Sequence, residues 1–142
     1  MASDVKPVPK PTAADQPYWD GLAEHRVVLA RCTACGTYSQ RLPMLCHNCT
    51  GEEFAWSQVS GRGSIYTYTV ARQSWVEGFA EEIPYVVVSV ALEEQPDTYL
   101  TTNLVGDYDL DELDLGLPVV AEFEARGDAT LLQFRLDRST HV

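Results

Sequence analysis

The chain has 142 residues and a formal net charge of −11, because 21 acidic residues outnumber ten lysines and arginines. This length fits one ordinary domain or two very small ones that share a core, and the charge argues against generic binding of nucleic-acid phosphates. The longest apolar stretch, residues 85–92, is too short to span a bilayer, and the N-terminus has no basic or apolar signal region. We therefore expect a cytoplasmic protein that binds neither nucleic acid nor membrane.

Residues 1–14 form a proline-rich segment, which favours an extended backbone without internal hydrogen bonds. We expect a flexible tail that either lies on a partner or is a free terminus. A short helix is predicted over residues 15–26, with Asp15 as its cap and Pro17 in its first turn.

The predicted helix places Tyr18, Trp19 and Leu22 on one face, opposite Asp20 and Glu24. A helix of about two turns is not stable alone. Its aromatic face is therefore expected to pack either on the next module of this chain or on another subunit.

All four cysteines of the chain lie in two C-x-x-C pairs, Cys32 with Cys35 and Cys46 with Cys49, separated by ten residues. Each pair suits a tight turn that points two thiolates at one centre, and a glycine follows each pair, where such a turn favours a residue that tolerates positive φ. The glycines are Gly36 and Gly51. Four thiolates form a closed tetrahedral set for one structural Zn²⁺.

Two other readings of the cysteines are a thioredoxin-like redox pair and disulfides. The first needs a single C-x-x-C that opens a helix, and the second needs an oxidising compartment. His47 lies between the last two cysteines, but four sulfurs already fill the site, so we interpret it as an exposed polar residue.

Short strands are predicted at residues 27–31, 38–41 and 53–59, around the cysteines. Such strands cannot build a core themselves and depend on the metal. We interpret residues 27–59 as a rubredoxin-like zinc ribbon.

Five further strand candidates follow a glycine-rich turn at residues 60–63, so the fold class is mostly β. Residues 84–92 are nearly all apolar, as in a central strand with both faces covered. The five candidates are residues 64–71, 84–92, 98–105, 118–124 and 130–136. With a single helical turn at 108–115 capping one end, they predict a five-stranded OB-fold barrel over residues 60–142, or alternatively a small sandwich.

With these elements in order, the chain resembles the zinc-ribbon/OB-fold domain of unknown function that is encoded beside thiolases and thiolase-like aldolases, the acyl-CoA-associated zinc-ribbon proteins. The resemblance covers about residues 17–136. It rests on the helix motif 18–22, the two cysteine motifs 29–36 and 46–49, and the G-R-G-S-I-Y-T-Y motif at 61–68. The usual proline after the third cysteine is replaced by His47, which is not a ligand.

The resemblance implies a non-catalytic accessory subunit that docks on a thiolase-like enzyme dimer in an α2β2 complex, with acyl-CoA shared at the interface. The reaction of that enzyme would be retro-aldol cleavage or thiolysis, with steroid side-chain degradation as one expected setting. Phosphate groups of CoA would meet the arginine-rich middle segment, since residues 26–72 contain five arginines and two glutamates. The candidate CoA contacts are Arg31, Arg41, Arg62 and Arg72, with solvated surface or partner ion pairs as the alternative.

Partner contacts near the substrate mouth are expected from Tyr18 and Trp19 and from the loop 73–83. In that loop, Trp75 and Phe79 are large apolar groups of the kind that often mark an interface. The alternative is that both side chains fold back and plug the barrel end.

Three other functions stay open at this point. In the first, the chain would be a partner of a hot-dog-fold enoyl-CoA hydratase. In the other two, it would be a free-standing CoA-ester carrier or a nucleic-acid-binding ribbon/OB module. Residues 73–142 hold fifteen acidic residues against three arginines, which disfavours the last of these.

Overall fold

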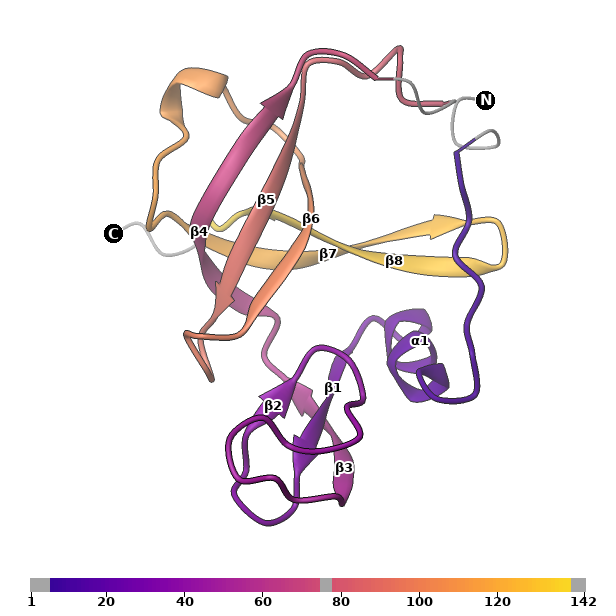
Figure 1. The fold of residues 1–142 in the computed structure, drawn as a ribbon. Coiled ribbons are helices and arrows are strands. Elements are labelled where there is room, and N and C mark those ends of the chain that lie inside the picture. The colour runs from indigo at the N-terminus through magenta and orange to yellow at the C-terminus, as the bar shows by residue number, and fades with distance from the viewer. Residues whose placement is uncertain (1–5, 75–77, 139–142) are drawn as a thin grey trace.

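The computed structural model describes residues 6–74 and 78–138 and confirms a mostly β protein with one short N-terminal helix (Figure 1). A three-stranded ribbon and a five-stranded barrel follow the helix. The elements are α1 (Gln16–Ala23), β1 (Val27–Cys32), β2 (Tyr38–Ser39), β3 (Phe54–Val59), β4 (Arg62–Ala71), β5 (Tyr85–Leu92), β6 (Tyr99–Val105), the 3₁₀ turn η2 (Leu110–Glu112), β7 (Pro118–Arg126) and β8 (Ala129–Leu136). No helix in the described ranges is long and apolar enough to cross a membrane.

Helix α1 is shorter than the predicted 15–26, and the cap prediction is wrong in one respect. Asp15 occupies the N-cap position, but its carboxylate makes no capping bond. It instead accepts hydrogen bonds from the backbone N–H and the hydroxyl of Thr12, at 2.6 and 2.9 Å. Close packing holds the helix in place. Leu22 is fully buried, and a Cβ at Gly21 would lie 2.7 Å from the Val28 side chain.

The ribbon is an antiparallel sheet in the order β2-β1-β3. Strand β3 pairs with β1 over six residues, whereas β2 contributes only two residues and not the predicted 38–41. The chain bends at Gln40 and Arg41 toward the second cysteine pair. Edge strand β2 is therefore short because the loop to the second cysteine pair begins there.

The barrel is closed in the order β4-β5-β6-β8-β7, with β7 returning to β4. This topology confirms the OB-fold prediction over the sandwich alternative. The seam between β6 and β8 is parallel and has two register pairs, Leu104 with Phe134 and Val105 with Arg135. Near one end, the Tyr68 hydroxyl donates to the carbonyl of buried Leu113, just after η2.

Strand β5 differs from the expectation that both its faces are covered. Buried and half-buried residues alternate along it. Val86, Val88 and Val90 point inward and are fully buried. A closed barrel has one interior, so the other face of β5 lies on the outer surface.

The ribbon and barrel share one hydrophobic core. Leu22 of α1, Leu29 of β1 and Val59 of β3 belong to the same buried cluster as Ile65 and Phe134 of the barrel. The ribbon is therefore fixed on the barrel by apolar packing as well as by the chain itself.

The segment before α1 crosses the β7–β8 hairpin near its turn (Figure 1). Lys6 is 9 % exposed and pairs with Glu82, and the carbonyl of Pro7 accepts a hydrogen bond from Arg126 at 3.3 Å. Residues 6–8, which we expected in a flexible tail, thus contact the barrel of the same chain because it offers them acidic and cationic partners.

Candidate functional site

The two cysteine turns have the same backbone hydrogen bonds. In the first, the Cys32 N–H donates to Thr37 and the Cys32 carbonyl accepts from Gly36, both at 2.9 Å. In the second, the Cys46 N–H donates to Gly51 at 2.8 Å and its carbonyl accepts from Thr50 at 2.9 Å. This repeated turn directs both pairs of side chains to one point.

The four sulfur atoms lie within 4.8 Å of one another. Cys32 Sγ is 3.5 Å from Cys49 Sγ, and Cys35 Sγ is 3.6 Å from Cys46 Sγ. These separations are far too long for a disulfide bond. Sulfurs placed 2.3 Å from a tetrahedral Zn²⁺ would lie about 3.8 Å apart, so the cluster fits a four-thiolate metal site with no position left for substrate.

The role predicted for Gly51 is wrong. Gly36 has a φ of +79°, as expected, but in the second turn the left-handed residue is Thr50, with a φ of +65°. A Cβ at Gly51 would lie 3.2 Å from Cys32 Sγ and 3.3 Å from Cys49 Sγ. Gly51 is therefore needed for space beside the sulfurs and not for its backbone angle.

Polar neighbours favour the thiolate form of two cysteines, Cys35 and Cys32, whereas, against a lowering hydrogen bond from the Gly51 backbone, the adjacent cysteine side chains raise the pKa of Cys49 to about 12. Hydrogen bonding by the Thr37 hydroxyl, and then by the Asn48 side chain, lowers the pKa of Cys35 to about 5. The pKa of Cys32 is also lowered, chiefly by the backbone N–H of Cys35. Since metals bind the thiolate, these contacts prepare the ligands; His47 is exposed beside them.

The aromatic pair of α1 borders an open cleft. Tyr18 and Trp19 pack edge to face, with ring centroids 5.1 Å apart, and burial raises the pKa of Tyr18 to about 12. Both rings also contact the common core. They line a cleft of about 480 Å³ between α1 and the ribbon, together with Arg41, Leu42 and Trp56.

Of the two loop aromatics, Trp75 lies outside the described residues. Phe79 is half-buried and packs on its own chain. Its ring lies 4.7 Å from the Lys6 ammonium, 5.7 Å from the Arg126 guanidinium and 5.5 Å from the Tyr85 ring. A partner contact by either aromatic stays a prediction.

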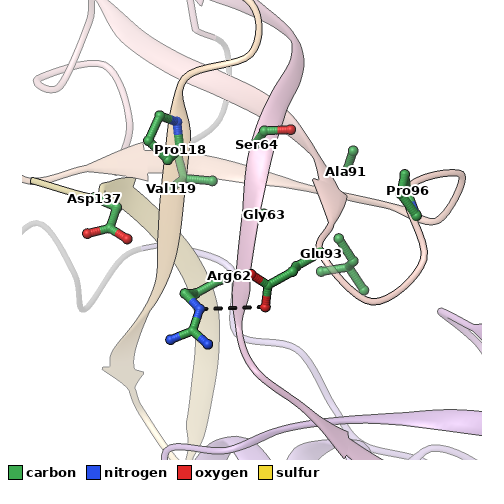
Figure 2. Close-up of a pocket in the computed structure, with 10 residues that line it drawn as sticks. Arg62, Gly63, Ser64, Ala91, Glu93, Pro96, Pro118, Val119 and Asp137 are labelled. Carbon is green, nitrogen blue, oxygen red and sulfur yellow. Dashed lines mark ion pairs between the residues drawn. The ribbon is translucent and has the colours of Figure 1, made fainter. Parts of the chain in front are cut away.

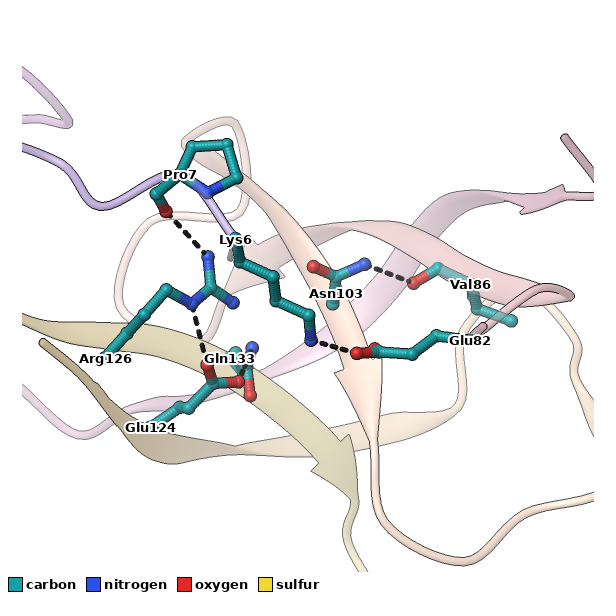
Figure 3. A network of polar contacts seen from close by, with 8 residues as sticks. All are labelled: Lys6, Pro7, Glu82, Val86, Asn103, Glu124, Arg126 and Gln133. Atoms are coloured by element: carbon teal, nitrogen blue, oxygen red, sulfur yellow. Dashed lines mark hydrogen bonds and ion pairs between the residues drawn. The ribbon is translucent and has the colours of Figure 1, made fainter. Parts of the chain in front are cut away.

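Lys6 and Arg126, the two cations beside Phe79, belong to a polar network that was not expected from the sequence. Figure 3 shows the polar contacts of this network. Arg126 is 7 % exposed, and its Nε donates to Glu124 at 2.9 Å. Gln133 donates to the other carboxylate oxygen of Glu124 at 2.8 Å. This network joins the N-terminal segment, the loop before β5 and the β7–β8 hairpin, which no local sequence pattern connects.

The four arginines proposed for CoA phosphates do not form one cluster. Arg62 begins β4 and Arg72 follows its end, so they are about 30 Å apart at ~3.3 Å per residue. Arg62 Nε lies 3.6 Å from Glu93 at the rim of a pocket of about 310 Å³ (Figure 2). Gly63 lines the same pocket, and a Cβ there would collide with the Ala91 carbonyl oxygen.

Two of the four arginines have no polar partner among the residues that the structure describes. Arg31 is engaged, because its Nε donates to the Gly36 carbonyl at 2.9 Å and its guanidinium lies over the Tyr38 ring. In contrast, Arg41 and Arg72 make no hydrogen bond or ion pair within residues 6–74 and 78–138.

Comparisons with known proteins identify the family. A family model described as the C-terminal OB-fold domain of ChsH2 matches residues 56–124. A "DUF35 domain-containing scaffold protein" from Methanocaldococcus jannaschii is 30 % identical over 107 residues, which cover 74 % of this chain and 73 % of that relative. The chain belongs to the DUF35 family. The resemblance drawn from the sequence is thereby confirmed.

Other comparisons differ in coverage. A "Probable enoyl-CoA hydratase alpha subunit" from Thermomonospora curvata is 36 % identical over 123 residues, but the chain spans only 37 % of that relative's length. A solved structure described as "Ltp2-ChsH2(DUF35) aldolase" has 32 % identity and a TM-score of 0.78, covering 91 % of this chain and 98 % of that chain.

A second solved structure shows that the fold extends to distant DUF35 members. This Sulfolobus solfataricus protein of unknown function is 15 % identical, with a TM-score of 0.60. It covers 88 % of this chain and 86 % of that chain.

Proposed function

We propose that this DUF35 chain is a non-catalytic accessory subunit of a thiolase-fold enzyme that acts on acyl-CoA thioesters. In this proposal, it binds and stabilises the enzyme dimer in an α2β2 complex and helps form the substrate and CoA site. The reaction is retro-aldol cleavage or thiolysis, with steroid side-chain thioesters as one substrate class. The observation that carries the proposal is the similarity along nearly the whole chain to the DUF35 chain described in an aldolase structure.

The cysteine cluster supports a structural and not a catalytic role. We assign one Zn²⁺ to Cys32, Cys35, Cys46 and Cys49, whose sulfur separations fit a closed four-thiolate site. All cysteines of the chain are used there. The ring of His25 stacks on Phe123, with ring centroids 4.9 Å apart. The proposal therefore places the reaction on the partner enzyme.

The test is co-expression with a thiolase-fold enzyme of the same genome, with a tag on only one of the two proteins. We expect a stoichiometric complex that cleaves acyl-CoA substrates, while neither protein does so alone. A chain that stays monomeric beside that enzyme, and leaves its activity unchanged, would contradict the proposal.

A second candidate partner is an enoyl-CoA hydratase. The Thermomonospora curvata relative supports it, because the region similar to this chain is part of a longer protein named as a hydratase subunit. The same tagged chain should then capture a hot-dog-fold hydratase and not the thiolase-fold enzyme. Hydration of an enoyl-CoA by the recovered complex is the measurement that separates the two.

A further inference from the structure

We propose that the chain docks on its enzyme through one continuous surface, the cleft between α1 and the ribbon together with the loop that follows β2. The inference rests on the proposed function for the class of partner. It adds that the surface recognises an apolar side chain of the enzyme that lies next to a carboxylate. The docking surface consists of Tyr18, Trp19, Arg41, Leu42, Met44 and Trp56, with Leu45 at its edge.

The loop of this surface is unusually apolar for its exposure. Met44 is 91 % exposed, Leu45 51 % and Leu42 41 %. Among the described residues, three of the seven exposed large hydrophobic side chains thus fall within four consecutive positions. Clustered apolar side chains at the surface mark a protein interface, and methionine adapts its shape to a partner surface.

The loop continues into the cleft, because Leu42 belongs to both. The cleft walls carry two tryptophans and a tyrosine, the residue types that contribute most to binding at protein interfaces. These walls are rigid, since Tyr18 and Trp19 pack on the common core and Trp56 lies in β3, paired with β1. A rigid aromatic cleft of about 480 Å³ accepts an apolar side chain with little ordering cost.

The charge of the docking surface indicates which charged group of the partner lies beside the apolar side chain. Arg41 lines the cleft and has no hydrogen-bond or ion-pair partner within the described ranges. Residues 26–51 contain three arginines and no acidic residue, although the whole chain carries −11. Asp15 also lines the cleft and keeps its negative charge, but one of its oxygens already accepts two hydrogen bonds from Thr12. Arg41 has no such partner in the described chain, so it can pair with a carboxylate of the enzyme.

The exposed aromatic pair on the barrel lacks these properties. Tyr66 and Tyr99, on the barrel, stack on each other with centroids 4.3 Å apart and cover part of their own surface. They line none of the pockets described above. Among the described residues, the cleft and its loop are thus the apolar surface best suited to bind a partner.

The test measures affinity for the thiolase-fold enzyme by calorimetry with two matched pairs of variants. Met44→Asp is compared with Leu115→Asp, because Leu115 is 61 % exposed on the barrel. Arg41→Glu is compared with Arg72→Glu, because both arginines lack partners within the described ranges. We expect at least about tenfold weaker binding for Met44→Asp and Arg41→Glu, and changes below about twofold for the controls. Unchanged zinc content and melting temperature establish that all four variants fold.

Three outcomes overturn the inference. In the first, the enzyme binds wild type while Met44→Asp and Arg41→Glu bind equally well, or the controls weaken binding as much; the proposed function then stands and only the docking surface is wrong. In the second, the isolated chain forms a dimer that Met44→Asp dissociates, so the surface is occupied by a second copy. In the third, wild type binds no enzyme, which removes the proposed function as well.

Discussion

The side chain of Gln95 forms two hydrogen bonds with the backbone of Tyr38, 57 residues earlier in the chain. Its Oε1 accepts from the Tyr38 N–H and its Nε2 donates to the Tyr38 carbonyl, both at 2.9 Å. Nε2 also contacts the Thr98 hydroxyl. The amide thereby pairs with β2 as a neighbouring strand residue would. It covers a ribbon edge and ties the ribbon to the loop between β5 and β6.

Replacing Gln95 by Ala should lower the free energy of unfolding by about 1–3 kcal/mol, because two backbone groups of Tyr38 lose their partners. Chemical denaturation measures this loss. The control is Gln73→Ala, at an exposed residue, which should change stability by less than about 0.5 kcal/mol. Equal effects of the two changes would show that the Gln95 contacts add nothing.

Purified protein should contain one zinc ion per chain, and Cys49→Ser should lose it, because the remaining three thiolates no longer close the site. A chelator should lower the melting temperature of wild type, since metal binding stabilises the ribbon. His47→Ala is the matched control, with His47 exposed between the second pair of cysteines. Its zinc content should equal that of wild type, and a loss there would make His47 a ligand.

Gly51→Ala should weaken zinc binding by about 10–100-fold, because the added methyl group would press on Cys32 Sγ and Cys49 Sγ. Thr50→Gly, one residue earlier, should retain zinc and change stability by no more than about 1 kcal/mol, since it relieves the strain of a positive φ. Competition with a chromogenic chelator measures both affinities. If Thr50→Gly lost zinc affinity and Gly51→Ala kept it, the steric role assigned to Gly51 would be wrong.

Arg126→Met should destabilise the protein by about 2–4 kcal/mol, because it leaves Glu124 without its buried cation. Arg135→Met is the matched control. Arg135 also pairs with a glutamate of β7, Glu122, but its side chain is 46 % exposed. An exposed pair contributes about 0–1 kcal/mol, so thermal unfolding should separate the two variants clearly.

Glu112 gives a pH-dependent contribution. Hydrogen bonds from Arg138, and then from the Asp109 N–H, hold the pKa of Glu112 below its ordinary value. A lowered carboxyl pKa contributes stability above the ordinary pKa, and this stability is lost as pH falls through the lowered value. In carboxyl NMR titrations, Arg138→Gln should raise the Glu112 pKa, whereas Arg135→Gln should leave it unchanged. An unmoved Glu112 pKa in Arg138→Gln would contradict the assignment.

The features predicted correctly from the sequence are those with local patterns. The cysteine spacing alone indicates the sulfur cluster, and strand periodicity with glycine turns indicates the barrel, because both depend on neighbours along the chain. The apolar composition of β5 was misleading. Valine favours any strand, so it does not distinguish a strand covered on both faces from one at a barrel surface.

The contacts that were missed join distant segments. Nothing near Gln95 points to Tyr38, and the bond from Arg126 to the Pro7 carbonyl spans 119 residues. The positions of the arginines could not be predicted either, because a count of charges gives the net charge of a segment but not where each side chain lies. Arg62 and Arg72 belong to one basic segment of sequence, yet they lie at opposite ends of β4.

The parallel seam between β6 and β8 is one boundary between two parts of the barrel. Strands β4, β5 and β6 form a three-stranded meander, and β7 with β8 forms a hairpin of eight register pairs. Only three register pairs join β7 to β4, and two join β8 to β6. We therefore expect the meander and the hairpin to be protected as two separate units in native-state hydrogen exchange. Their separation would expose Phe134, the fully buried side chain at the seam.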